Sequence, residues 1–161
     1  MVRAYVDTSV VVALSDPADE FHGGSVAFVS ILQDRAIPSS IGPPFMLEMA
    51  KAAEQRGTQG ALRLILAIEG YKVELTRVLG DRLWTLSSGY ASLGVLRGNR
   101  TLDLLHYASA TQLGCTHLAS WDKKHFNEKI EKRANRVNAS RGLATLKVGD
   151  PIIIARYLGI A

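Results

Sequence analysis

The sequence predicts a single α/β domain built on a mainly parallel sheet. Stretches with helical and strand-like hydrophobic periodicity alternate along the whole chain, which is typical of successive βαβ units. Short β-prone runs end in an acidic residue or a turn, and most helical stretches begin at a recognisable capping residue. The 161 residues match the length of one domain that can bury a core. We therefore expect residues 1–161 to form one unit.

The composition indicates a soluble protein of a reducing compartment. Hydrophobic residues make up 47% and charged residues 21%, which is ordinary for a globular protein. Cys115 is the lone cysteine, so no intrachain disulfide or zinc cluster is expected, and it should be a buried small hydrophobe. Arg3 and Asp7 interrupt the apolar start, and no apolar run approaches the roughly 20 residues of a membrane helix. We expect no membrane association and a cytoplasmic location.

The chain opens with a β-prone run at residues 2–6 that ends in Asp7. Ser9 is the expected N-cap of a short helix over the apolar residues 10–14. In an open α/β sheet, ligands bind at the carboxyl ends of the strands, so Asp7 is expected to face a cleft. Capping of the helix explains an aspartate at this position equally well.

The remaining elements follow from periodicity and from turn residues. Gly57 and Gly60 mark a helix start, while Thr101 and Asp150 are expected N-caps. Helices are predicted at residues 24–35, 45–53, 61–69, 82–93, 104–113 and 152–158, and strands or extended segments at 36–41, 72–78, 116–120 and 143–148.

Three further acids stand at defined positions in these elements. Glu48 has apolar neighbours at i−3 and i+4, so it lies on the inward face of its helix, where a carboxylate needs a cationic or metal partner. A place at the edge of the apolar stripe is the simpler alternative. Asp103 lies in a first helical turn, where the helix dipole favours an acid. Asp122 follows a strand, as Asp7 does.

These four carboxylates are far apart in the chain, and only the fold can bring them together. Clustered carboxylates repel one another, so they either take up protons or bind a hard cation such as Mg²⁺ or Mn²⁺.

Residues 123–141 carry seven bases and two acids, which leaves 12 bases and 13 acids elsewhere. A basic patch suits a polyanionic partner, although a solvated charged face has the same composition. An acid-held metal beside a basic patch indicates phosphodiester hydrolysis.

Four motifs in this order resemble the PIN domain family. They are Val-Asp-Thr-Ser at residues 6–9, the single Glu48 on a helix, Thr-Leu-Asp-Leu-Leu-His-Tyr-Ala at 101–108, and Ser-Trp-Asp-Lys-Lys-His-Phe at 120–126. The resemblance covers nearly the whole chain and is closest to the VapC-like toxins of type II toxin–antitoxin pairs. It implies a three-layer α/β/α fold and a Mg²⁺- or Mn²⁺-dependent endoribonuclease that acts on RNA. An antitoxin partner and a homodimer would follow.

The resemblance also assigns roles by position. It implies that the catalytic and metal-binding set is Asp7, Glu48, Asp103 and Asp122, with Ser9 and Ser120 orienting the acids beside them. We further expect the basic segment, which is longer than in the shortest family members, to extend an RNA groove. The expected RNA-binding residues are Lys123, Lys124, Lys132, Arg133 and Arg136.

Other interpretations use some of the same residues. A haloacid dehalogenase-type phosphatase needs a second aspartate two residues after Asp7, where Ser9 stands, and a receiver domain needs an acid pair near the start. A non-catalytic PIN-like module that docks RNA or a protein partner is the remaining alternative. His106 could face the site but is expected to be a core histidine, and His125 is expected to be a solvated loop residue.

Overall fold

The computed structural model describes residues 2–78, 80–98 and 100–159. Five short strands form one sheet in the order β3-β2-β1-β4-β5, and every pair of neighbours is parallel. The strands are β1 (Ala4–Val6), β2 (Ser39–Ile41), β3 (Glu74–Leu75), β4 (His117–Ala119) and β5 (Lys147–Gly149). The predicted mainly parallel sheet is confirmed.

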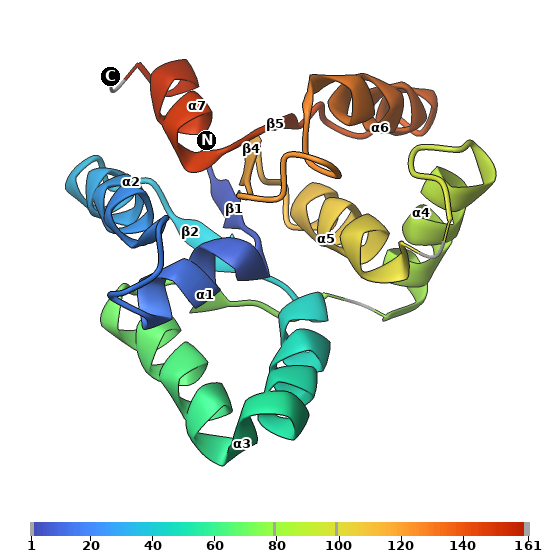
Figure 1. Cartoon of the computed structure of the whole chain (residues 1–161). Helices are drawn as coiled ribbons and strands as arrows, with labels where there is room; N and C mark the ends of the chain where they lie inside the picture. The colour runs from blue at the N-terminus through green and yellow to red at the C-terminus, as the bar shows by residue number, and fades with distance from the viewer. Residues whose placement is uncertain (1, 79, 99, 160–161) are drawn as a thin grey trace.

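Helices cover both faces of this sheet, as the three-layer prediction requires (Figure 1). The helices are α1 (Thr8–Ser15), α2 (His22–Asp34), α3 (Pro44–Gly70), α4 (Gly80–Ser92), α5 (Thr101–Gln112), α6 (Glu128–Ser140) and α7 (Pro151–Tyr157). None of the helices in the described part of the chain has the length and hydropathy of a transmembrane span.

The alternation of side chains along β1 separates two hydrophobic cores. Tyr5 packs with apolar residues of α4, α5 and α6, whereas Ala4 and Val6 pack with those of α1, α2, α3 and α7. In β4, Leu118 belongs to the first core and Ala119 to the second. Successive residues of a strand point to opposite faces, so these two central strands are buried on both sides.

Two predicted caps are wrong by position. Asp7, not Ser9, is the N-cap of α1, because the Asp7 carboxylate accepts a hydrogen bond from the Ser9 main-chain N–H at 3.2 Å. Helix α5 already begins at Thr101, with Arg100 as its N-cap. The predicted cap at Asp150 is confirmed, since its side chain accepts from the Ile153 N–H at 2.8 Å.

Helix α3 consists of two half-helices joined at Gly57, which gives it the V shape seen in Figure 1. Gly57 has φ 72° and ψ 175°, a conformation that residues with a side chain rarely adopt. The predicted break at this glycine is therefore confirmed. It turns the second half of α3 back along the outside of the molecule.

Helix α6 was not predicted from the sequence, which indicated only a basic segment there. Asn127 caps it by accepting from the main-chain N–H groups of Lys129 and Ile130. Ile130, Ala134 and Val137 follow at helical spacing and are buried. The basic residues thus lie on the outer part of an amphipathic helix.

Candidate active site

Asp7 lies where the central strand β1 meets α1, and its two carboxylate oxygens have different partners. Oδ2 accepts from the Ser9 hydroxyl at 2.7 Å and from the Ser120 hydroxyl at 2.8 Å. Oδ1 lies 3.2 Å from Nε2 of His106. Because β4 is the parallel neighbour of β1, Ser120 at the end of β4 reaches the same edge of the sheet as Asp7. Asp7 thus both caps α1 and points to a site.

Glu48 reaches this site from the first half of α3. The Thr8 hydroxyl donates to its Oε2 atom, and Nε2 of His106 lies 3.0 Å from the same oxygen. Burial raises the pKa of Glu48, but the hydrogen bond and charge of His106 and the hydrogen bond of Thr8 together lower it below its ordinary value. The expected cationic partner of Glu48 is therefore a histidine. Glu48 is held in its ionised form.

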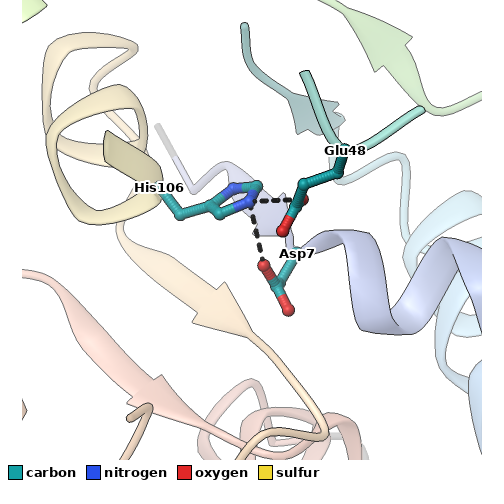
Figure 2. Close-up of side chains that lie close together, drawn as sticks. All are labelled: Asp7, Glu48 and His106. Carbon is teal, nitrogen blue, oxygen red and sulfur yellow. Dashed lines mark hydrogen bonds and ion pairs between the residues drawn. The ribbon is translucent and has the colours of Figure 1, made fainter. Parts of the chain in front are cut away.

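A chain of hydrogen bonds fixes the imidazole between Asp7 and Glu48 (Figure 2). The Gly42 main-chain N–H donates to the Tyr5 hydroxyl at 3.1 Å, and that hydroxyl lies 2.8 Å from Nδ1 of His106. On the other side of the ring, Nε2 faces two carboxylate oxygens, which only accept hydrogen bonds when ionised. We therefore assign a proton to Nε2 in both the neutral and the charged imidazole.

The surroundings of His106 favour its charged form. Burial lowers the pKa of His106, but the carboxylates of Asp7 and Glu48 outweigh this effect and raise it above the ordinary value. The side chain is 1% exposed, so the prediction of a core histidine is confirmed as far as burial goes. The same histidine also contacts two acids of the site.

Asp103 and Asp122 form a second group with His125. The Nδ1 atom of His125 lies 2.7 Å from Asp122 Oδ2 and 3.5 Å from Asp103 Oδ2. Burial raises the pKa of Asp103, the nearby His125 lowers it, and the net change is upward. The His125 side chain is 12% exposed, so the prediction of a solvated loop residue is wrong.

All four predicted acids line one cavity of about 520 Å³. They come from the end of β1, from α3, from the first turn of α5 and from the loop after β4. In the described part of the chain, two groups have potential ligand atoms within 4.8 Å of one another: Asp7, Glu48 and His106, and Asp103, Asp122 and His125. This oxygen-rich donor set fits a hard divalent cation such as Mg²⁺ or Mn²⁺.

Comparison with solved structures identifies the fold. The crystal structure of VapC20 from Mycobacterium tuberculosis, a toxin that cleaves the sarcin-ricin loop, superposes with a TM-score of 0.58. The match covers 88% of this chain and 97% of that chain at 16% sequence identity. The chain has a PIN-like fold. No protein-family model and no curated protein matches the sequence.

The PIN-like fold does not bring the predicted RNA-binding residues into the acidic cavity. Lys132, Arg133 and Arg136 line a separate depression of about 320 Å³ along α6. Lys132 pairs with Glu128 at 2.7 Å, and Lys123 pairs with the Asp150 carboxylate at 3.1 Å. The Lys124 main-chain N–H donates to Asp122 Oδ1 at 3.0 Å. The role of these five bases in RNA binding remains a prediction.

Two cations that were not predicted from the sequence line the cavity of this PIN-like domain. Among the described side chains they are Lys51 and Arg63, one from each half of α3. Lys51 lies three residues after Glu48 and so belongs to the same helix face, a signal that was available in the sequence. No such signal marks Arg63, because it reaches the cavity only through the turn of the chain at Gly57.

Proposed function

We propose that this protein is a metal-dependent endoribonuclease that hydrolyses RNA phosphodiester bonds and is the toxin of a toxin–antitoxin pair. The observation that carries the proposal is the meeting of four carboxylates from four separate elements in one cavity of a PIN-like domain. The similarity to VapC20, a toxin that cleaves an RNA loop, supports the same class of substrate. Cytoplasmic action on RNA is part of this proposal.

The proposed roles follow from the hydrogen bonds. Asp7 and Glu48 are held by neighbouring donors, so each presents a carboxylate in a fixed orientation to a shared cation. Asp103 and Asp122 line the same cavity and complete the proposed metal-binding and catalytic set. Bound Mg²⁺ or Mn²⁺ would supply an activated water and stabilise charge on the scissile phosphate. Ser9 and Ser120 position Asp7 through hydrogen bonds from their hydroxyls to its Oδ2 atom.

The proposed antitoxin and homodimer interfaces require apolar surface. Helix α3 supplies exposed apolar side chains on both of its halves, namely Met46, Leu47, Leu62 and Leu66. Exposed apolar side chains grouped on one element mark protein interfaces more often than singly scattered ones do. Size-exclusion chromatography with light scattering tests the homodimer, and identification of a protein that co-purifies with this chain from its native source tests the antitoxin.

Cleavage of a mixed pool of single-stranded and structured RNAs tests the activity. The protein is assayed with Mn²⁺, with Mg²⁺ and with EDTA, beside Asp7→Asn purified in the same way. Asparagine keeps a side-chain oxygen for the α1 cap but removes the charge, so the variant is expected to fold. We expect metal-dependent cuts that disappear with EDTA and in the variant. Equal cutting by both proteins would point to a contaminating nuclease.

A non-catalytic docking module gives a different result in the same assay. The module would bind RNA or a protein partner without cutting, and Asp7→Asn would leave that binding nearly unchanged. Mn²⁺ titration by calorimetry adds a readout that does not depend on finding the right RNA. Loss of Mn²⁺ binding in Asp7→Asn supports the nuclease, whereas the absence of Mn²⁺ binding in the wild type contradicts it.

A further inference from the structure

Helix α3 lines the acidic cavity with a row of polar side chains that the carboxylate site does not account for. Lys51 and Gln55 come from the first half of α3, and Gln59 and Arg63 from the second half. Each pair is separated by four residues and therefore occupies one helix face. We call Lys51, Gln55, Gln59 and Arg63 the α3 ladder.

The α3 ladder is continuous with the carboxylate site. Glu48, Lys51 and Gln55 follow one another at spacings of three and four residues, so they share one face of the first half-helix. Seven residues of α-helix span about 10 Å, so Lys51 and Gln55 lie within about 10 Å of Glu48 along the helix axis. The turn at Gly57 then brings Gln59 and Arg63 back to the same cavity.

The two cations of the α3 ladder are available to a ligand. Lys51 and Arg63 are exposed, and neither forms an ion pair within 4.0 Å among the described residues. The charge of Lys51 does act on Glu48, whose pKa it helps to lower. By contrast, Lys123 and Lys132 already contact acids of the protein itself. Lys51 and Arg63 therefore bring positive charge to the wall of the same cavity that the four acids line.

We propose that Lys51 and Arg63 bind the phosphates of single-stranded RNA next to the cleaved bond, while Gln55 and Gln59 hydrogen-bond its bases or 2′-hydroxyls. This inference rests on the proposed nuclease function. A cavity of about 520 Å³ is the size of a small-ligand site. That volume suits one or two unstacked nucleotides, the form that RNA adopts in loops and single strands. Amide side chains read such exposed bases through both donor and acceptor groups.

The proposed role of the α3 ladder is tested by measuring RNA binding to a double variant that lacks both of its positive charges. The double variant Lys51→Gln/Arg63→Gln is compared with Arg35→Gln/Arg156→Gln, which instead removes two exposed charges, one just after α2 and one in α7. Glutamine is close to lysine and arginine in helix propensity, and circular dichroism checks that both proteins stay folded. Binding of a short fluorescein-labelled single-stranded RNA is measured by anisotropy in Ca²⁺ at several salt concentrations, with the RNA checked for integrity.

We expect the ladder pair to weaken binding roughly 10- to 30-fold near 0.1 M salt and to flatten the salt dependence by about 1.4 in log–log slope. The control pair should change binding less than about threefold. A duplex of the same sequence should bind the wild type weakly and respond equally to both pairs. An equal loss of single-stranded RNA binding in the two double variants would overturn the proposed role of the α3 ladder.

A parallel cleavage assay with Mn²⁺ separates this proposal from the nuclease function. If the wild type cuts RNA but the ladder double variant binds RNA as well as the control double variant does, the proposed role of the α3 ladder is wrong and the proposed nuclease function is supported. If the ladder double variant loses RNA binding but the wild type never cuts RNA, the proposed nuclease function is wrong and the proposed role of the α3 ladder is supported. A wild type that neither binds nor cuts RNA overturns both.

Discussion

The Nε2 atom of His106 lies 3.0 Å from Oε2 of Glu48, although the two residues are 58 positions apart in the chain. The same nitrogen lies 3.2 Å from Asp7 Oδ1, so one imidazole N–H orients two carboxylates. Replacing His106 by leucine leaves these two acids without their shared donor. We expect His106→Leu to weaken Mn²⁺ binding about 10- to 100-fold, the usual effect of losing a partner that orients metal ligands.

Isothermal titration with Mn²⁺ measures this effect, and His106→Gln is the matched rescue variant. The glutamine amide N–H occupies nearly the position of the imidazole Nε2–H and should recover much of the affinity. Recovery by glutamine, beside an unchanged fold, separates positioning of the acids from mere filling of the core. Wild-type Mn²⁺ affinity in the leucine variant contradicts this role.

Local signals in the sequence predicted much of the architecture. Strand-like runs followed by acids placed Asp7 and Asp122 at the end of parallel strands, and the glycine at position 57 predicted the break in α3. Helix α6 was not predicted because only three apolar residues recur at helical spacing within its highly charged sequence. A charged surface and a buried stripe coexist on one helix, and composition alone does not separate them.

The site was predicted less completely than the fold. The four acids that line the cavity were singled out because each stands at a strand end or in an early helical turn. The contacts of His106 and His125 depend on how α5 and the loop after β4 pack against β1, which no local pattern encodes. Arg63 reaches the cavity through a reversal of the chain, so its place also follows from tertiary structure alone.

Ser9 and Ser120 hold the same oxygen of Asp7, which predicts an unequal response to single and double substitution. Ser9→Ala or Ser120→Ala alone leaves one hydroxyl on Oδ2, so we expect at most a tenfold loss of Mn²⁺ affinity. The double variant frees that oxygen of both hydroxyls and should lose more than the two single variants combined. Calorimetric Mn²⁺ titration of the four proteins measures the coupling. Strictly additive losses would show that the two hydroxyls act independently.

The basic surface of α6 provides a separate prediction for RNA binding. Reversing the charge of Lys132, Arg133 and Arg136 to glutamate should weaken binding and flatten its salt dependence, because fewer phosphates are neutralised. Since this surface lies outside the acidic cavity, we expect the position of the RNA cuts to stay the same. Anisotropy titrations over a range of salt measure the first effect, and sequencing of cleavage ends measures the second. Unchanged binding at every salt concentration would remove α6 from the RNA-binding surface.

Gly57 controls the path of α3, and substitution there should affect both stability and RNA binding. A Cβ atom at this position meets no atom within 4 Å, so the cost of Gly57→Ala comes from the backbone conformation alone. That cost is about 1–3 kcal/mol at φ 72° and ψ 175°. The chain can relieve the strain by straightening α3, which would carry Arg63 away from the cavity. We therefore expect a lower free energy of unfolding and weaker binding of single-stranded RNA.

Gly70→Ala is the matched control for this prediction. Gly70 is the last residue of α3, its φ is not positive, and a Cβ there also meets no atom within 4 Å. Alanine at a helical position is favoured over glycine by up to about 1 kcal/mol, so this variant should be as stable as the wild type or more so. Urea unfolding and RNA anisotropy are measured for both proteins. Equal stability of the two variants would show that α3 accepts alanine at its turn, and the link between Gly57 and the placement of Arg63 would then be wrong.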